Sequence, residues 1–311
     1  MRKITLILIA FMMTGISCIY AQKDAVDYFT AGSNAKTYIG NYVEPLMASF
    51  GHNLNNGWYS TADPLNLGRF TISTGLSVSF VPSSDQTFAI GKYTASTMFG
   101  PNTSNGNIPN TQTPIPKGDG VSLSPLPLLQ GSVGLWKHTE LMIRAYPNID
   151  IANYKVGYFG LGVKHDIKQW IPGWKKMPFS LSFIGTFANA GLTLTDPLLV
   201  DNKGAAQTLK YSASGWGANL VISRKFTVAT IYGGLRLSHN STDFNISGNF
   251  ATASHGLGYM HEDMTFNNTG NQFGINAGLR LKAGFFAFNL DGVLAPGGYS
   301  SATLGLIFGM F

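Results

Sequence analysis

Charged side chains that recur at even spacing offer the clearest chemistry in this 311-residue sequence. Glu140, Arg144, Arg236, Arg280 and Asp291 all fall on the polar phase of segments in which polar and apolar residues alternate. In a closed sheet this phase faces the interior, because an Arg facing lipid at mid-bilayer costs about 2–4 kcal/mol. Such residues either pair with one another and fill the lumen, or line a path for a solute. We expect an internal ion-pair network, which can also provide a polar lining.

A second group of residues has the chemistry of a lipid–water boundary. Lys164, Lys168, Trp170 and Trp174 lie within one short stretch of the chain. Trp favours the membrane interface, where its ring is half buried, and a neighbouring lysine can reach lipid phosphates. We therefore predict that these four residues contact outer-membrane lipid. The alternative is a ligand-binding loop.

No pattern typical of an enzyme stands in a suitable context. The sequence lacks a nucleophile elbow, a phosphate loop and a dinucleotide fingerprint between a strand and a helix. No two of the six histidines have the i, i+4 spacing of a zinc-binding helix. His255 and His261 lie near Glu262 and Asp263, but a solvated loop explains them better than a metal site. We predict no catalytic activity, no cofactor and no metal.

Strands must position the inward-facing charges, because side chains alternate between the two faces of a strand. The clearest alternation lies in residues 70–80, 229–236, 273–281 and 286–291. Weaker candidates are residues 127–137, 139–147, 154–166, 178–190, 208–224 and 243–252. Turn residues predict breaks at 239–241, 267–270 and 296–298, and residues 100–120 are predicted as a long exposed loop.

Composition indicates that the outer face of this sheet meets lipid. Only 12% of the residues are charged, against roughly 25% in soluble domains. Beyond the N-terminal stretch no window approaches 18 uninterrupted apolar residues, so the sequence predicts strands, and not helices, as the spanning elements. Lys and Arg number 21 against 15 Asp and Glu, and their scatter argues against a nucleic-acid partner. We predict an all-β fold, a transmembrane antiparallel β-barrel of about 12–14 strands, over residues 69–311.

Residues 1–21 are predicted to be a secretory signal peptide. Arg2 and Lys3 precede an apolar run that is too short to span a bilayer, and Ala21 offers a small residue at the cleavage site. The lone Cys18 gives a rival interpretation as a lipidated residue, although the leucine usual three positions upstream is missing. If cleavage follows Ala21, the mature chain has no cysteine, and disulfides and thiol chemistry are excluded.

Residues 22–68 are predicted to form a short helical plug, or a periplasmic element, ahead of the barrel. Apolar residues at spacings of three and four indicate helix over residues 24–50, and Gly32 and Pro45 are expected to break it into two or three pieces. An Asn- and Gly-rich passage follows at residues 51–68.

The last residues predict a partner during assembly. Residues 299–311 are apolar, punctuated by glycine, and end in Phe311. This ending is typical of outer-membrane barrels, whose last strand closes the sheet and presents a terminal aromatic residue to the barrel-assembly machinery.

Two resemblances accompany these patterns. Asp63-Pro64-Leu65 and residues 68–73 resemble the start of the outer-membrane transporters of long-chain fatty acids and toluene-like compounds. That resemblance implies a 14-stranded barrel with an N-terminal hatch that passes lipophilic substrates sideways, although the hatch's Asn-Pro-Ala box is absent. Residues 53–62 and 164–172 resemble an uncharacterised family of Gram-negative outer-membrane barrel proteins, which implies no mechanism.

Together these observations predict a porin-like protein of the cell outer membrane that passes or binds a small lipophilic solute. The plug would narrow the lumen, and the inward charges would line it. The alternative is a structural, adhesion or secretion-system scaffold without transport activity. In that case residues 100–120 and 253–270 would be the working surface.

Overall fold

The computed structural model describes residues 26–103, 105–151, 154–195, 208–251 and 259–311. The predicted signal peptide and Cys18 lie outside the described residues.

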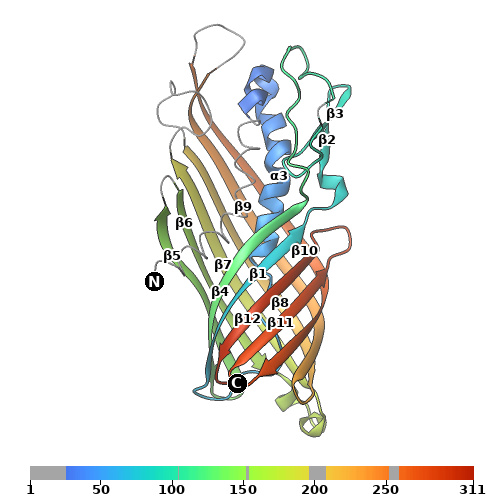
Figure 1. The fold of residues 1–311 in the computed structure, drawn as a ribbon, viewed down its shortest axis with the longest axis vertical. Helices are drawn as coiled ribbons and strands as arrows, with labels where there is room; N and C mark the ends of the chain where they lie inside the picture. Colours follow the sequence, from blue (N-terminus) through green and yellow to red (C-terminus); the bar gives the residue numbers. More distant parts are fainter. Residues whose placement is uncertain (1–25, 104, 152–153, 196–207, 252–258) are drawn as a thin grey trace.

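Ten antiparallel strands close a barrel (Figure 1). Each pairs with its neighbours in the chain, and β1 closes the ring between β12 and β4. The barrel strands are β1 (Phe70–Phe80), β4 (Leu123–Leu135), β5 (Thr139–Ile151), β6 (Tyr154–Asp166), β7 (Ser180–Thr195), β8 (Thr208–Lys225), β9 (Ala229–Ala251), β10 (Tyr259–Ala283), β11 (Phe286–Leu294) and β12 (Ser301–Gly309). The prediction of an all-β antiparallel barrel is confirmed.

The predicted count of 12–14 barrel strands is wrong. It assumed about 9–11 residues per strand, whereas β9 has 23 residues and β10 has 25. Residues 239–241 and 267–270, predicted as turns, lie inside these two strands and pair with each other, as in Asn240 with Gly270. Pairing along both edges of a strand outweighs a local preference for a turn.

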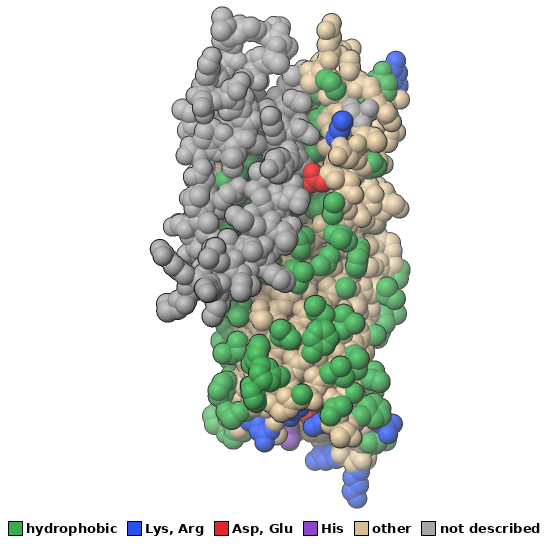
Figure 2. Space-filling model, viewed as in Figure 1, with side chains coloured by type: hydrophobic (Ala, Val, Ile, Leu, Met, Phe, Trp, Pro, Cys, Tyr) green, Lys and Arg blue, Asp and Glu red, His purple; other side chains and the backbone are tan. Residues whose placement is uncertain are grey.

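The alternation of the strands is confirmed. On β1, Phe70, Ile72 and Phe80 are exposed on the outside, whereas Ser77 and Ser79 are buried inside. Figure 2 shows apolar side chains spread over the lower part of the outer surface. A closed barrel with an apolar belt is the form in which strands cross a bilayer, so the protein is an outer-membrane β-barrel.

The two ends of the barrel differ. At the end where β12 finishes, the strand pairs β4–β5, β8–β9 and β10–β11 are joined by short turns; we call this the lower end. The upper end carries residues 81–122 and the extensions of the longest strands (Figure 1). Short turns are typical of the periplasmic side and long segments of the extracellular side.

A helix fills the upper lumen. The 3₁₀ segment η1 (Val26–Asn34) leads into α3 (Ala35–Asn53), which lies among the strands (Figure 1). The predicted break at Gly32 is confirmed by its positive φ of 60°. The predicted break at Pro45 is wrong, because α3 continues through it. Proline removes one helical hydrogen bond, and burial of α3 on several sides compensates for the loss.

None of the described helices is both long and apolar enough to span a bilayer.

Residues 81–122 form a cover beside the upper part of α3. It contains η2 (Ser83–Asp85) and the paired strands β2 (Thr87–Ile90) and β3 (Tyr93–Ser96). Met98 N donates to the Tyr42 carbonyl at 3.0 Å, and Tyr42 Oη donates to the Lys117 carbonyl at 2.9 Å. The predicted loop at 100–120 is irregular, with one isolated bridge. It is only partly exposed, because Ile108 and Ile115 are buried.

Candidate functional site

Below α3 the chain crosses the lumen as an irregular segment of turns and bends, residues 54–65, which we call the strap. Two arginines from different strands hold Asn56 near its start. Arg144 Nη1 donates to the Asn56 carbonyl at 2.8 Å, and Arg236 Nη1 donates to Asn56 Oδ1 at 2.6 Å. Hydrogen bonds from charged donors are stronger than neutral ones. The strap is therefore fixed to β5 and β9 at one residue.

Arg144 also packs against an aromatic ring of the strap. Its guanidinium carbon lies 3.9 Å from the ring centre of Trp58, and its Nε donates to Gln130 Oε1 at 2.9 Å. Trp58 is itself buried, and its indole N–H donates to the Leu54 carbonyl. A desolvated cation over a Trp ring contributes about 2 kcal/mol. This stacking therefore adds to the hydrogen bonds that hold the strap.

The lower half of the strap is attached to three further positions on the wall. Thr61 Oγ1 lies 3.2 Å from Ser223 Oγ on β8, and Ala62 N donates to the same Ser223 oxygen. Ser182 on β7 donates to the Ala62 carbonyl. Leu65 N donates to Glu140 Oε2 on β5 at 3.0 Å. Backbone and side-chain bonds together lay the strap across the barrel.

Glu140 forms a buried ion pair with Lys164 at 2.9 Å, the one ion pair within the described part of the chain. The prediction that Lys164 contacts lipid is wrong: it is 2% exposed and faces inward. Its neighbour Val163 takes the outward position of β6. Lys164 lies within β6, whereas the tryptophans grouped with it in the sequence lie beyond the end of this strand.

The other three interface candidates lie at the lower end. Lys168 belongs to η3 (Lys168–Trp170), and Trp174 begins η4 (Trp174–Lys176), both between β6 and β7. Trp170 is 64% exposed and Trp174 36% exposed. Their contact with lipid stays a prediction.

Between the strap and strands β1, β4 and β12 lies a small inner chamber with a cavity volume of about 50 Å³. Its lining includes the charged residues Glu140, Arg144, Lys164 and Arg280 and the apolar residues Trp58, Leu128 and Ile307. Two buried donors, Arg144 Nη2 and Arg280 Nε, have no hydrogen-bond partner within the described residues. Such donors are costly to leave unpaired, so the chamber favours an acceptor.

A second space, the vestibule, lies at the lower end with a cavity volume of about 440 Å³. It shares five residues with the inner chamber, namely Thr61, Asp63, Leu65, Arg280 and Phe311. Arg280 lies 4.4 Å from the ring centre of Phe311, so these two side chains stand at the boundary. The vestibule therefore adjoins the chamber at the lower end.

The sequence placed five charges on the inward phase, and all five point into the barrel. Three of them, Glu140, Arg144 and Arg280, line the chamber. Arg236 and Asp291 do not line the chamber. Arg236 holds Asn56, and Asp291 Oδ2 accepts from Asn276 Nδ2 at 3.3 Å. The expected network of ion pairs among the five is wrong, because Glu140 pairs with Lys164 instead.

Sequence reasoning missed Gln130 and the role of the strap. Gln130 links Arg144 to the Trp58 carbonyl, which its Nε2 reaches at 3.2 Å. The signal was present in the Asn-rich run 53–56, whose side chains are short enough to bond the wall. Asn53 Oδ1, for example, accepts from Ser77 and Ser79 of β1.

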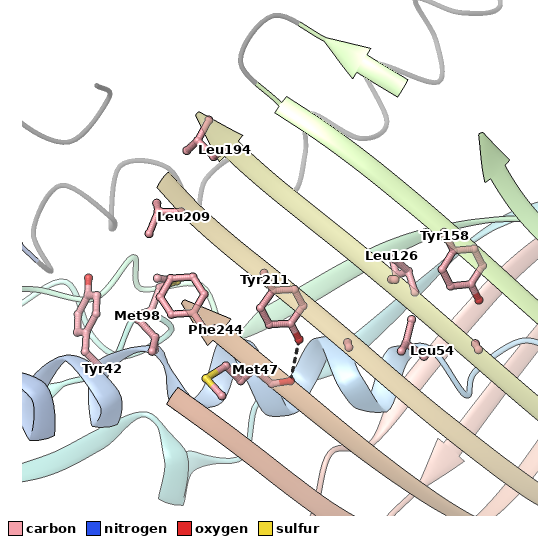
Figure 3. Close-up of a cluster of buried hydrophobic side chains, with 14 of the residues drawn as sticks. Tyr42, Met47, Leu54, Met98, Leu126, Tyr158, Leu194, Leu209, Tyr211 and Phe244 are labelled. Carbon is pink, nitrogen blue, oxygen red and sulfur yellow. Dashed lines mark hydrogen bonds between the residues drawn. The ribbon is translucent and has the colours of Figure 1, made fainter. Parts of the chain in front are cut away.

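Around α3 and the start of the strap, side chains from α3, the cover and the wall pack together (Figure 3). Tyr211 of β8 donates to the Met47 carbonyl at 3.1 Å, which ties the helix to the wall. The cluster includes Tyr42, Leu54, Met98, Leu126, Tyr158, Leu194, Leu209 and Phe244. This part of the lumen is therefore filled by protein.

The cover is fixed to the barrel near the end of α3. Tyr299, in the turn between β11 and β12, donates to Asp85 Oδ2 at 2.7 Å, and its ring stacks on His52 of α3 with 5.1 Å between centres. Burial first, and then Asp85, raises the pKa of Tyr299 above its ordinary value. The phenol therefore stays a hydrogen-bond donor at physiological pH.

No group of three or more His, Cys, Asp and Glu that could hold a metal is found among the described residues. Of the histidines weighed for a metal site, His255 and the side chain of His261 lie outside what is described.

Comparison with known proteins identifies a family and several solved barrels. A model described as "Family of unknown function (DUF6588)" matches residues 1–310. No curated protein matches the chain.

The solved structures are similar at low sequence identity. The attachment invasion locus protein Ail of Yersinia pestis is 12% identical, with a TM-score of 0.30 over 78% of this chain and 97% of that one. The translocator domain of the autotransporter NalP from Neisseria meningitidis is 9% identical, with a TM-score of 0.37 over 80% and 90%. A Pseudomonas aeruginosa FadL homologue is 9% identical, with a TM-score of 0.24 over 85% and 96%.

Proposed function

The chain belongs to the DUF6588 family of unknown function, and from that premise we propose a function on the chemistry of the chamber. The strap moves to make room for a small amphipathic solute, whose polar group the chamber binds, and the solute then passes. The observation that carries the proposal is a charged chamber with unpaired donors beneath a segment that closes the lumen.

The lining of the chamber suits a solute with one polar and one lipophilic part. The unpaired Nη2 of Arg144 can donate to a carboxylate or another acceptor. Leu128 and Ile307 add apolar surface to the same lining. The sequence predicts a lipophilic solute, and the apolar lining residues suit a lipophilic part of it. The charged lining residues require that another part of the solute carries a hydrogen-bond acceptor.

Passage requires the strap to move, because it crosses the lumen between the chamber and α3. The strap is joined to the wall by hydrogen bonds, each with a net contribution of about 0.5–1.5 kcal/mol, and by the buried ring of Trp58. A segment held in this way can be released in parts. The packed apolar cluster around α3 is a less suitable moving part, since it would expose a large buried surface.

A disulfide between the strap and the wall tests this proposal. Thr61→Cys and Ser223→Cys place two sulfurs where oxygens now lie 3.2 Å apart. Cys18→Ser removes the chain's one cysteine from the background. We expect the oxidised double variant in proteoliposomes to lose uptake of octanoate, a small amphipathic anion, and to regain it on reduction.

The two single-cysteine variants are the matched controls, and they should take up octanoate equally under oxidising and reducing conditions. Equal uptake by the oxidised and reduced double variant, with the disulfide verified by mass spectrometry, would contradict passage by movement of the strap.

A scaffold without transport activity is the second candidate, and the dense attachment of the strap favours it. Bonds to β5, β7, β8 and β9 make the lumen a solid support. In that case the wild-type protein should take up no octanoate, and removal of part of the cover should abolish capture of a partner while leaving the barrel folded.

A further inference from the structure

The vestibule concentrates positive charge at the lower end of the barrel. Five cationic side chains line it, from the chain before β1, from η3 and from the ends of β8 and β10: Arg69, Lys168, Lys225, Arg280 and Lys282. Asp63 is the one acidic residue in the lining. The side chains that line the vestibule therefore carry four net positive charges, before the carboxylate of Phe311 is counted.

These cations lie close enough to repel one another. Lys225 and Arg280 both lie opposite Thr230 of β9, one on each side, and Arg280 and Lys282 share the ring of Phe311. Within the described residues none of the five has a carboxylate within ion-pair distance, since the single pair there is Glu140 with Lys164. Unscreened like charges at one site destabilise the empty state, and a bound anion relieves that repulsion.

Several of these side chains are also held in place. Lys168 Nζ donates to the carbonyls of Met177 and Phe179. The Lys282 ammonium and the Arg280 guanidinium both lie over the ring of Phe311, at 4.8 and 4.4 Å from its centre. Arg280 Nε is buried and has no hydrogen-bond partner among the described residues. The cations are thus arranged before any ligand arrives.

We propose that the vestibule is a binding site for a phosphate-bearing anion. A phosphate group carries about −1.5 to −2 charges at pH 7 and three acceptor oxygens. Four net positive charges around one cavity suit such a multivalent group better than a single carboxylate. Arginine gives a planar fork for two phosphate oxygens, and lysines act as point charges. The same chemistry serves a soluble phosphate compound and a phospholipid head group.

The site does not depend on passage through the barrel. It lies on the lower side of the strap, and the Thr61–Ser223 disulfide changes none of its charges. Binding of a phosphate anion by the locked protein would therefore persist even if the proposal of a moving strap failed.

Calorimetry with inorganic pyrophosphate tests the site on the full mature protein in phosphatidylcholine nanodiscs and phosphate-free buffer. We expect binding that weakens as salt rises, because exposed charges are screened within about 8 Å at physiological ionic strength. The double variant Lys225→Gln, Lys282→Gln should bind about ten-fold more weakly, since it removes two unpaired cations.

The matched control is Lys175→Gln, Lys176→Gln. These exposed lysines of η4 lie at the same end but outside the vestibule lining, so the change in net charge is identical. Pyrophosphate affinity should stay at the wild-type value.

A second measurement distinguishes the source of the phosphate. Native mass spectrometry on protein from nanodiscs that also contain phosphatidylglycerol reports retained lipid. Pyrophosphate binding lost only in the vestibule variant supports a soluble ligand. Retention of phosphatidylglycerol lost only in that variant supports a lipid head group. Absence of both, or equal losses in the two double variants, overturns the proposal.

Discussion

Arg144 links three parts of the molecule at a single side chain. It is fully buried, bonds Gln130 of β4, stacks on Trp58 and donates to the Asn56 carbonyl. Its position explains how one inward-facing residue on β5 can fix a segment nearly 90 residues away in the chain.

Replacing Arg144 should therefore loosen the strap. We expect Arg144→Ala to lower the free energy of unfolding by about 2–4 kcal/mol, because it leaves buried acceptors unpaired. Arg144→Lys should recover only part of this, since lysine lacks the planar fork. Urea unfolding in detergent measures the effect. Arg224→Ala, at an exposed arginine of β8, should stay within about 0.5 kcal/mol of wild type; an equal loss there would count against the assignment.

The Glu140–Lys164 pair gives a second prediction. Glu140→Gln should destabilise the barrel by about 3–5 kcal/mol, because it strands a buried ammonium. Adding Lys164→Met to Glu140→Gln should restore much of the loss, since the double variant leaves no unpaired charge. A double-mutant cycle from urea unfolding gives the coupling. Additive losses would show that the two side chains act independently.

For a single residue, the sequence predicts only the face of the strand on which its side chain lies. The even spacing of Glu140 and Arg144 fixes the face on which they lie, because side chains alternate along a strand. Their partners come from segments distant in the chain, so spacing gives no information about them. Lys164 was misplaced because its nearest neighbours in sequence are interface residues, whereas its neighbour in space is Glu140.

Among the elements, the strap depends on a close approach at Gly57. This residue has a φ of +66°, and a Cβ there would lie 2.7 Å from Leu128 and 2.8 Å from Thr303. The strap can lie against β4 and β12 only because this position has no side chain.

Gly57→Ala should lower the free energy of unfolding by about 2–3 kcal/mol, from backbone strain and from overpacking. Gly68→Ala isolates the strain, because Gly68 also has a positive φ, of +76°, but has open space at its Cβ position. We expect a loss of about 1 kcal/mol there. Equal losses in the two variants, measured by urea unfolding, would mean that crowding at Gly57 has no effect.

The strands themselves were predictable, whereas their ends were not. The candidate at residues 154–166 coincides with β6, although its alternation is one of the weaker ones. The glycine and asparagine residues near 240 and 268 look like turns locally, but here they pair across β9 and β10. Pro45 is a similar case in a helix. Its intrinsic preference predicts a break, but packing of α3 keeps the helix continuous there.

As a whole, the molecule exposes apolar side chains around a closed wall, a pattern that low charge content and two-residue alternation already indicated. We expect the mature protein to aggregate when detergent is diluted below its critical micelle concentration, because its belt then meets water. Size-exclusion chromatography with and without detergent measures this. A monodisperse peak in plain buffer would contradict the membrane assignment.

The strand count could not be obtained in the same way, since it depends on how far each strand extends beyond the bilayer. Composition limits only the total length of sheet, and ten long strands and fourteen short ones use similar numbers of residues. The inner chamber could not be predicted from the sequence either, because segments that are distant in the chain enclose it.

The unequal strand lengths have a consequence for the cell surface. About 9–11 residues suffice for a crossing, so β11 and β12, with nine each, stop near the bilayer while β10, with 25, continues. The barrel wall therefore rises higher above the membrane on the side of β9 and β10 than on the side of β11 and β12, where the cover lies. Antibodies and proteases from outside the cell would reach residues 81–122 on the side of the shorter strands, whereas β9 and β10 shield α3 on the other side.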